Sequence, residues 1–546
     1  MHFNSPLEAF YHWVNEDPTY TFLRQPINRK FIEYSYEDAN SQIRKMANSL
    51  HQLGIKEGDH VAILSKNCAH WIMADLAIMM AGCISIPLYA TLGAESIREI
   101  LEHSESKAVI IGKLDDYSKQ ASGIPDIPKI GVELYGINEE HSWEKLIETS
   151  QEIEKPHEQT ADELMSIMYT SGTTGTPKGV MHTVSSFAQL INTAVDVFDL
   201  PPRPRYFSYL PMTHIAERAG IELSSIYRGS TVSFPESLDT FAEDLASVQP
   251  QTFFGVPRIW QKFQEKVLEK MPQKKLDTLL SIPLVGVLVK KKIQKAMGLA
   301  SSKISYSGAA PIAVSLQEWY RKLGIEIHQA YGMTEDCILS HFNLPGKNKF
   351  GTVGQPLPGV TGKLSEEDEI LIKSNCLMKG YFKNPEKTAE MFTEDGFLRT
   401  GDIGEYDHDG YLKITGRLKD QFKTDKGKYI SPAPIELALS KNNDIEQVCI
   451  VGTGIPQPIA LVIPSESGKE KSKEDFDQSI WTSILEVNPS LEAYEKLAKA
   501  VVMKEEWSVD NGLMTPTLKV KRNRVEANHM QMYPQWFEKS EKVVYE

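Results

Sequence analysis

The stretch YTSGTTGTPKGVMHT, residues 169–183, decides how the rest of this chain is interpreted. An apolar run, Leu164 to Met168, comes just before it, and Thr170 begins a series of small and hydroxylated residues. A hydrophobic run that stops at glycines, serines and threonines predicts a strand that leads into a loop. Glycines allow close approach to a ligand, while hydroxyls, backbone N–H groups and Lys178 can bind phosphate oxygens. The stretch therefore predicts a phosphate-binding loop, with a flexible surface loop as the alternative.

The loop does not have the Walker pattern. Lys178 lies at the right distance from Gly172, but Pro177 replaces the second glycine and Gly179 replaces the serine or threonine. YTSGTTGTPKG instead resembles the phosphate loop of the adenylate-forming (AMP-binding) superfamily, which includes acyl-CoA synthetases, luciferases and the adenylation domains of peptide synthetases. By that resemblance, the nucleotide is bound by Thr170, Ser171, Gly172, Thr173, Thr174 and Lys178.

Length and composition describe a globular protein of at least two domains. The chain has 546 residues, of which 41% are hydrophobic and 24% charged. A formal charge of −14 argues against a nucleic-acid partner. The five cysteines show no CxxC spacing and indicate free thiols in a reducing compartment. The N-terminal segment has no apolar core typical of a signal peptide, so we expect a cytoplasmic protein.

Short Val/Ile-rich runs alternate with helical periodicity in the N-terminal part. We expect strands at 31–36, 61–67, 83–89 and 107–112, and helices at 36–53 and 69–80. This alternation predicts an α/β fold with a parallel sheet covered by helices on both faces. The apolar window 71–90 is interpreted as a buried helix running into a strand, not as a membrane span. The polar stretch 465–477 is expected to be a solvated loop.

Two further elements point to an acyl group. The sequence RYFSYLPMTHIAER, 205–218, is similar to the YLP-x-x-H-x-x-ER element of long-chain acyl-CoA synthetases. The resemblance puts His214 beside the acyl carboxylate; a structural histidine at a helix start is the alternative. The sequence FFGVPRIWQKF, 253–263, resembles an element of the same subfamily in which a tryptophan gates the acyl tunnel. Trp260 is therefore a candidate gate, or else an ordinary helix-anchoring aromatic.

The sequence GIEIHQAYGMTE, 324–335, predicts a strand that delivers adenine- and metal-binding groups. Tyr331 can stack on an adenine, and Glu335 offers a hard oxygen to magnesium. YGMTE resembles the superfamily's Y-G-x-T-E, which implies that Thr170 and Glu335 hold the metal; a glutamate paired with an arginine is the alternative. The residues assigned to the nucleotide in this region are Gly308 from KISYSGAAPI, with Gln329, Ala330, Tyr331, Gly332 and Thr334.

The superfamily's TGD and GR-x-K-D elements match at Asp402 and Arg417, with Asp402 expected after one strand and Arg417 at the end of the next. An aspartate can accept both ribose hydroxyls, and an arginine can bridge ribose and phosphate. Lys419 falls on the family's hinge. The loop DKGKYISPAPIE, 425–436, corresponds to the one that meets the arm of coenzyme A, and Lys423 and Gly427 are assigned to cofactor binding there. Lys519 aligns with the lysine that enters the site for adenylation; without the resemblance it would be interpreted as a surface residue.

The resemblance implies a large AMP-binding α/β domain, 1–418, and a small mobile α+β domain, 419–546. It implies ATP-dependent ligation of a long-chain fatty acid to coenzyme A with Mg²⁺, in which Lys519, His214 and Glu335 are catalytic. The alternatives are a ligase for another carboxylic acid, a luciferase-like oxidase, and a catalytically dead binding module.

Residues 262–303 depart from the acidic balance of the chain, with ten lysines and three acidic residues. The lysines flank an apolar segment, Leu279 to Val289, that is too short to span a bilayer but long enough to enter an interface. We favour a buried hairpin with solvated lysine faces. Peripheral contact with an anionic membrane is the alternative.

Overall fold

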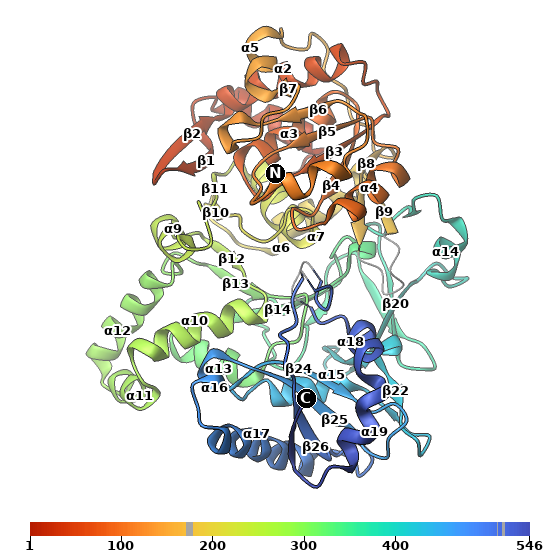
Figure 1. The fold of residues 1–546 in the computed structure, drawn as a ribbon. Coiled ribbons are helices and arrows are strands. Elements are labelled where there is room, and N and C mark those ends of the chain that lie inside the picture. The colour runs from red at the N-terminus through yellow and green to blue at the C-terminus, as the bar shows by residue number, and fades with distance from the viewer. Residues whose placement is uncertain (171–177, 510, 516–518) are drawn as a thin grey trace.

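The computed structural model describes residues 1–170, 178–509, 511–515 and 519–546. Figure 1 shows the N-terminal elements in the upper part of the molecule and the C-terminal elements in the lower part, with the middle of the chain between them. The α-helices of the described ranges are α1 Pro6–Glu16, α2 Tyr36–Gln52, α3 Ala69–Met80, α4 Ala94–His103, α5 Trp143–Thr149, α6 Val184–Val197, α7 Ile215–Glu217, α8 Ser224–Arg228, α9 Phe241–Val248, α10 Pro257–Lys270, α11 Gln273–Ser281, α12 Pro283–Ala296, α13 Val314–Lys322, α14 Pro385–Glu390, α15 Pro432–Leu439, α16 Glu466–Lys469, α17 Lys473–Val487, α18 Arg522–His529 and α19 Tyr533–Glu538.

An eight-stranded sheet forms the centre of the upper part, in the order β19-β9-β8-β4-β3-β5-β6-β7. The strands from β8 to β7 pair in parallel, whereas β9 and β19 run antiparallel at one edge. The expected strands and helices of the N-terminal part are confirmed, but the sheet is mixed. Its strands are β3 His60–Leu64, β4 Ile84–Leu88, β5 Ala108–Ile111, β6 Lys129–Gly131, β7 His141–Ser142, β8 Leu164–Thr170, β9 Lys178–Thr183 and β19 Gly380–Tyr381.

Local sequence explains the two helices nearest the N-terminal strands. Ser35 and Asp38 form a reciprocal capping box at the start of α2, so the first turn has its N–H groups bonded. Every residue of α3 is buried, which confirms that the apolar window 71–90 is a core helix followed by strand β4.

Two further sheets come from the N-terminal and middle parts of the chain. One has the order β10-β11-β1-β2, and the other, β12-β13-β14-β15-β16, carries the YGMTE element at the end of β14. Their strands are β1 Thr21–Ile27, β2 Lys30–Ser35, β10 Tyr206–Phe207, β11 Val232–Ser233, β12 Thr252–Phe254, β13 Ile304–Ser307, β14 Ile327–Tyr331, β15 His341–Phe342 and β16 Gln355–Pro356.

A four-stranded antiparallel sheet, β17-β18-β20-β21, corrects one expectation. Asp402 does not follow a strand: it lies inside β20 and faces Arg417 at the end of β21 in the antiparallel register. The strand continues past Asp402 because Ile403 and the residues after it keep pairing with β21. The strands are β17 Thr361–Leu364, β18 Glu369–Lys373, β20 Leu398–Tyr406 and β21 Leu412–Arg417.

The C-terminal part has its own sheet, β24-β25-β26-β27, and two hydrophobic clusters whose buried members all come from residue 422 onward. Helices α15 and α17 contact this sheet, while α18 contributes the buried Val525 and α19 the buried Tyr533 and Trp536 to the second cluster. The strands here are β22 Phe422–Lys423, β23 Tyr429–Ile430, β24 Ile445–Val451, β25 Ile459–Pro464, β26 Lys499–Val502 and β27 Val543–Tyr545.

The prediction of a solvated loop at 465–477 is wrong. Ser465 caps the short helix α16, and Ser472 caps α17 by accepting a hydrogen bond from the N–H of Asp475. Phe476 and Ile480 of α17 are buried in the C-terminal core. The charged residues of this stretch therefore form the solvent-facing side of a helix.

The lysine-rich segment folds as a helical hairpin, α11 and α12, that projects at the left-hand edge of Figure 1. The prediction of a buried hairpin is wrong, because Ile282, Leu284, Val287 and Leu288 are exposed at the connection between the two helices. Within the described ranges, no helix is both long and apolar enough to cross a membrane.

Candidate functional site

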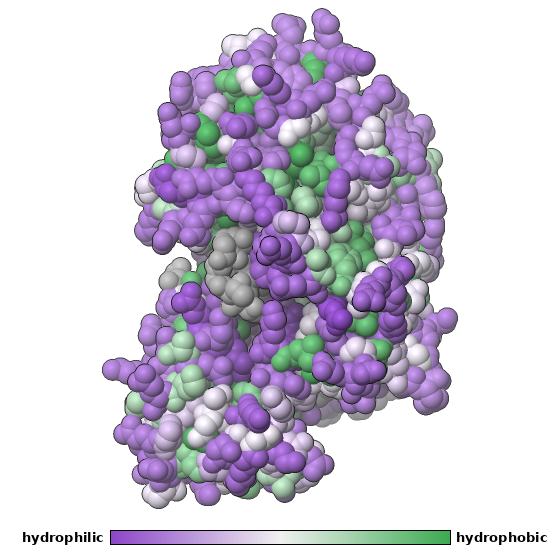
Figure 2. All heavy atoms as spheres, turned by 90° about the vertical axis from the view of Figure 1, so that its right-hand side faces the viewer, coloured by the Kyte–Doolittle hydropathy of each residue, from purple (hydrophilic) through white to green (hydrophobic). Residues whose placement is uncertain are grey.

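A cavity of about 1740 Å³ lies where the upper and lower parts of the molecule meet. Figure 2 views this junction from the side of α14, where hydrophilic side chains cover most of the surface. The cavity brings together residues from sequence elements far apart in the chain. The sequence-predicted residues that line it are Thr170, Lys178, His214, Gly308, Gln329, Ala330, Tyr331, Gly332, Thr334, Glu335, Asp402, Arg417, Lys419 and Lys519.

The phosphate-loop prediction can be followed at its two ends. Thr170, the last residue of β8, pairs with Lys178, the first residue of β9, and both line the cavity. Lys178 Nζ lies 5.7 Å from the centre of the Tyr381 ring, a cation–π distance. Burial and the nearby charges of Lys387 and Lys419 lower the pKa of Lys178. These three lysines lie near one another, and together they give this side of the cavity positive charge that can attract an anion. The remaining residues of the predicted loop, Ser171, Gly172, Thr173 and Thr174, lie outside the described residues.

Asp402 is buried and is hydrogen-bonded to two residues, the buried Tyr331 and the half-exposed Arg417. Arg417 Nε donates to Asp402 Oδ1 at 2.5 Å, and the Tyr331 hydroxyl donates to Oδ2 at 2.7 Å. The Asp402 charge raises the pKa of Arg417, and burial together with the same charge raises the pKa of Tyr331. A hydrogen bond to each oxygen therefore fixes the orientation of the Asp402 carboxylate. The carboxylate lies on the wall of the cavity, where the resemblance puts the ribose.

Glu335 is held from the other side of the same cavity. The Tyr381 hydroxyl donates to Glu335 Oε1 at 2.7 Å, while Oε2 makes no hydrogen bond within the described residues. Of the alternatives for Glu335, the arginine partner is not found in the described part of the chain: the partner is a tyrosine.

The residues available for magnesium fit the way that this ion is usually bound. Mg²⁺ keeps several waters and takes one or two carboxylates together with substrate phosphates. Glu335 supplies one carboxylate, and Thr170 lines the same cavity. No group of three or more His, Cys, Asp or Glu residues able to hold a metal occurs among the described residues, so these two would hold the ion jointly with a nucleotide.

The backbone near the YGMTE element leaves no space for larger side chains. A Cβ on Gly332 would lie 2.6 Å from Ile338 Cα, and one on Gly308 would lie 3.3 Å from the Ala330 carbonyl oxygen. Ala309 and Ile338 both have positive φ, 65° and 54°, and both line the cavity. A β-branched residue in this conformation is a true outlier, and such strain clusters at functional sites.

His214 caps helix α7 and presents one tautomer to the cavity. Its Nδ1 accepts a hydrogen bond from the N–H of Ala216 at 3.2 Å. Burial, with a smaller effect of the Lys519 charge, lowers the pKa of His214 to about 4, so the ring is neutral at physiological pH. A neutral imidazole that accepts at Nδ1 carries its proton at Nε2. His214 can therefore donate a hydrogen bond from Nε2 to a carboxylate in the cavity.

The last two residues of this element, Glu217 and Arg218, hold His214 in place without lining the cavity. Glu217 Oε1 accepts from the hydroxyl of Ser208 and from the N–H of Tyr209, both at 2.8 Å. Arg218 is fully buried, and its Nη2 donates to both oxygens of Asp75 on α3, at 2.8 and 2.7 Å. These bonds fix the turn before His214 and the helix after it.

Lys519 is one of the residues of the C-terminal part that line the cavity, together with Arg417 and Asp402. Its backbone is fixed by two bonds to Thr515, one from Lys519 N to Thr515 Oγ1 at 3.1 Å and one from Thr515 N to Lys519 O at 2.8 Å. The surrounding protein and the charge of Arg417 lower the pKa of Lys519 to about 8, against the opposing effect of Asp402. Its ammonium group is predominantly protonated at neutral pH.

Lys423 and Gly427 are not brought to the cavity. They belong to the hairpin β22–β23, in which Gly427 has a φ of +77° at the turn and Lys423 Nζ lies 5.4 Å from the centre of the Tyr429 ring. Lys419, by contrast, lines the cavity between β21 and this hairpin.

Part of the cavity lining is apolar, and we call this part the apolar arm. Its side chains come mainly from α6, β13 and β15. Arg228 also lines the cavity, and its Nη2 donates to the carbonyl oxygen of Phe198 at 3.1 Å. The side chains that line this arm are Leu190, Ile191, Ala194, Val197, Phe198, Ala219, Tyr306, Leu339 and Phe342.

Trp260 does not line this cavity, so the predicted gate is not supported by its position. It is fully buried, its Nε1 donates to the Gly255 carbonyl at 2.9 Å, and its ring lies against Phe253 and Tyr320. This packing is that of a helix-anchoring aromatic, the other interpretation of the sequence.

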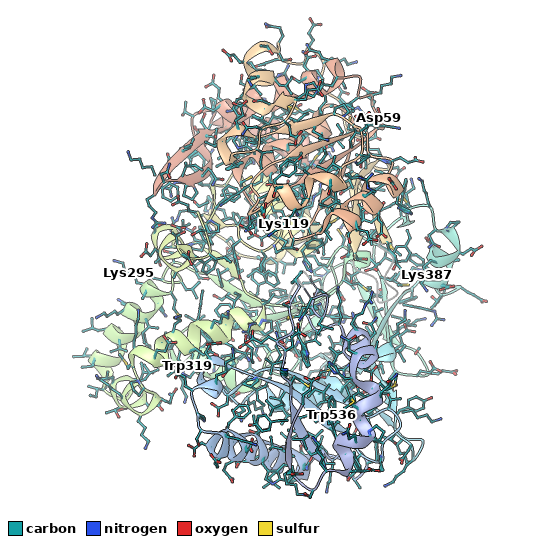
Figure 3. The ribbon with its side chains drawn as sticks, viewed as in Figure 1. Asp59, Lys119, Lys295, Trp319, Lys387 and Trp536 are labelled. Atoms are coloured by element: carbon teal, nitrogen blue, oxygen red, sulfur yellow. The ribbon has the colours of Figure 1, made fainter. Side chains whose placement is uncertain are left out.

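Sequence reasoning missed three residues of the site. Tyr381 and Lys387 belong to the element GYFKNPEKTAEMF, 380–392, which a family resemblance can locate but to which we gave no role. Tyr381 orients Glu335, and Lys387, which Figure 3 labels beside α14, lines the cavity and pairs with Glu390. Arg228 follows no motif, and only the fold shows that it lines the cavity.

Comparison with known proteins gives two family matches. Residues 10–382 match the family described as AMP-binding enzyme, and residues 419–541 match the AMP-binding enzyme C-terminal domain. Among curated proteins, a long-chain-fatty-acid–CoA ligase of Mycobacterium bovis is 28% identical over 582 residues, covering 96% of this chain and 95% of that protein. A long-chain-fatty-acid–CoA ligase of Rattus norvegicus is 29% identical over 576 residues, covering 91% of this chain and 83% of that protein.

Solved structures share the fold. The adenylation domain of a carboxylate reductase from Mycobacterium chelonae has a TM-score of 0.80 at 20% identity, covering 98% of this chain and 91% of that one. The o-succinylbenzoate CoA synthetase of Bacillus subtilis has a TM-score of 0.75 at 20% identity, covering 95% and 97%. The likeness confirms the predicted fold class, a large N-terminal α/β domain with a smaller C-terminal domain. The exact boundary at 418/419 stays a prediction.

Proposed function

Because this chain belongs to the AMP-binding enzyme family, we propose that it joins a long-chain fatty acid to coenzyme A through an acyl-adenylate, releasing AMP and pyrophosphate. The family assignment supports the predicted use of ATP, Mg²⁺ and coenzyme A. The observation that carries the choice of acid is the apolar arm of the cavity, in a lining that also includes His214 and Arg228. The curated relatives named as long-chain-fatty-acid–CoA ligases support the same choice.

The arm suits an alkyl chain because its walls offer almost no hydrogen-bonding groups. Leu190, Val197 and Phe342 give apolar contact, and burial of each methylene contributes about 0.8 kcal/mol. A carboxylate at the mouth of the arm would meet the Nε2–H of His214, which is neutral and needs no proton exchange to donate. The histidine therefore orients the acid, and the arm selects for its length.

In the first half-reaction the carboxylate oxygen attacks the α-phosphorus of ATP and pyrophosphate leaves. Negative charge accumulates on the phosphate oxygens, and the ammonium group of Lys519 would stabilise it, an effect typically worth several kcal/mol. Arg417, oriented by Asp402, adds a second cation on the same wall. A magnesium ion held by Thr170 and Glu335 would supply further charge neutralisation at the phosphates.

In the second half-reaction the thiolate of coenzyme A attacks the acyl carbonyl and AMP leaves. No nucleophilic side chain of the protein is needed. The five cysteines are all buried, and burial raises the thiol pKa of Cys83, Cys376 and Cys449 to about 12, which keeps these groups protonated.

A chain-length series tests the proposal. Acids from short to long, with aryl acids beside them, are assayed for AMP formation that depends on coenzyme A, in the unsubstituted enzyme and in two variants. Ala194→Phe fills the apolar arm and should shift the preference to shorter acids. Trp260→Ala should lower the stability by about 3–5 kcal/mol, because it empties a core position, while leaving the chain-length preference unchanged.

The possible results separate the alternatives. Turnover of aryl or short acids alone would show that the enzyme is a ligase for another acid. Absence of AMP formation with every acid would favour the catalytically dead binding module. A changed chain-length preference in folded Trp260→Ala would support the hypothesis that Trp260 gates the acyl tunnel.

A further inference from the structure

The helical hairpin α11–α12 carries an exposed apolar tip. We use this name for Ile282, Leu284, Val285, Val287 and Leu288, of which Leu284 is 83% exposed and Leu288 69%. Large aliphatic side chains gathered at one projecting point of a surface mark an interaction site more often than single exposed ones do. The tip has no role in the proposed reaction, since none of its residues lines the cavity.

The base of the hairpin is fixed to the rest of the molecule. The Trp319 Nε1 group donates to Gln273 Oε1 at 2.9 Å at the start of α11, and Gln294 Nε2 of α12 donates to the Leu323 carbonyl at 2.8 Å. Figure 3 labels Trp319 at this base and Lys295 at the end of α12 that is far from the connection between the two helices. Leu276 and Ile293 are buried in the core below. The tip is therefore presented by an anchored support.

The two helices also pack closely at the tip. A Cβ on Gly286 would lie 2.7 Å from the carbonyl oxygen of Leu280, so only glycine allows this approach. The exposed side chains cannot turn inward, because the space between the helices is already filled by backbone.

Lysines lie on the base side of the apolar tip, on both helices. The lysine collar comprises Lys274 and Lys275 on α11 and Lys290, Lys291, Lys292 and Lys295 on α12. None of these six forms an ion pair within the described part of the chain. Their charge is thus available, in a protein whose formal net charge is −14.

The outward face of α12 has two zones. Leu284, Leu288, Lys291 and Lys295 follow one another at intervals of four, three and four residues, which puts them on one side of the helix. The leucines lie toward the tip and the lysines toward the base. From Leu284 to Lys291 the helix rises by about 10 Å, which matches the depth to which interfacial segments enter the headgroup region.

The positive charge of the lysine collar distinguishes between the possible binding partners of the apolar tip. A symmetric contact with a second copy would bring the lysine collars of both copies together, because the same patch meets itself in such a dimer. An anionic lipid bilayer has both features that the hairpin needs: an apolar interior for the tip and negatively charged headgroups for the lysines. Juxtamembrane lysines are attracted to such a surface over the range of a Debye length, so the collar can act despite the acidic remainder of the chain.

We propose that the α11–α12 hairpin docks this protein on anionic membranes, with the apolar tip between the lipid headgroups and the lysine collar on their phosphates. This function is separate from the proposed ligation and does not depend on which acid is used.

Co-sedimentation with vesicles tests the proposal without any turnover. The full chain is mixed with vesicles of phosphatidylcholine alone or with phosphatidylglycerol added. Binding is expected only with the anionic lipid and should weaken with salt. Replacing Lys290, Lys291 and Lys292 by Gln should weaken the partitioning on the order of 100-fold. The double variant Leu284→Asp/Leu288→Asp should also release the protein.

Matched variants elsewhere provide the controls. Lys30, Lys107 and Lys155 replaced by Gln remove the same charge from exposed sites of the upper part, and Leu485→Asp/Met530→Asp changes exposed apolar groups of the C-terminal part. These should bind like the unsubstituted chain, and all variants should keep its melting temperature. Binding that survives both hairpin variants, or that is lost equally in the controls, would overturn the proposal. The proposal would also be overturned if the unsubstituted chain were a dimer and Leu284→Asp/Leu288→Asp dissociated it, because the tip would then bind a second copy of the chain.

Discussion

Two regions of the C-terminal part differ in whether they reach the cavity. The segment around Lys519 reaches into the cavity, where Lys519 joins Arg417 and Asp402. The hairpin β22–β23, with Lys423 and Gly427, contributes no residue to that cavity. The resemblance assigns the first region to adenylation and the second to coenzyme A. We infer that the arrangement described here serves the first half-reaction, and that the second needs a rotation near Lys419.

The largest expected effect is on adenylation in Lys519→Ala. Loss of one charged donor to the phosphate oxygens should lower the rate of acyl-adenylate formation at least about 10²–10³-fold. ATP–pyrophosphate exchange measures this step. Exchange at the unsubstituted rate would show that Lys519 is only a surface lysine.

Glu335→Gln should follow, with a loss of about two orders of magnitude in adenylation, comparable to the loss of one electrostatic contact to the transition state. Glutamine keeps an oxygen that accepts from Tyr381, so the melting temperature should change little. The measurement pairs pyrophosphate exchange with thermal unfolding. A variant that unfolds earlier but has normal specific activity would make Glu335 a structural residue.

The pH dependence should separate the two half-reactions. The pKa of Lys519 is lowered to about 8, so the charged form dominates below that pH and is lost above it. The kcat/KM of adenylation should fall about tenfold per pH unit above this value, since it reports the free enzyme. Thioester formation from supplied acyl-adenylate should lack this fall. A flat adenylation profile well above pH 8 would contradict the role of Lys519.

The smallest expected effect is that of Gly427→Ala on the coenzyme A step. Gly427 has a φ of +77°, where an alanine is strained by about 1–2 kcal/mol, so the hairpin should change shape and thioester formation should fall several-fold. Gly410→Ala is the matched control, because Gly410 has a φ of +78° and an open surrounding in another turn. Equal loss of adenylation in both variants would mean that the effect is one of stability alone.

Motif resemblance selected polar residues that the fold brings together, while their binding roles stay predictions. Tyr331, Asp402 and Arg417 are far apart in the sequence, yet they form one hydrogen-bonded cluster on the cavity wall. What the sequence could not show are contacts chosen by the fold. Tyr381 reaches Glu335 across 46 residues, and the ring of Trp260 lies against Tyr320, which belongs to another helix.

Local composition misled in two places. The charged residues of 465–477 concealed the capping serines and the buried periodicity of α17. The apolar segment of α12 suggested a core position, but only the packing of α11 and α12 shows that its leucines point outward. In both cases composition records how polar a stretch is, and not which side of it meets the core.

The most direct test of the two-region account is thioester formation by Lys519→Ala from supplied acyl-adenylate and coenzyme A. The account predicts a rate close to that of the unsubstituted enzyme, because Lys519 belongs to the other half-reaction. A loss as large as that seen in adenylation would contradict it, since one residue would then serve both steps or support the fold as a whole.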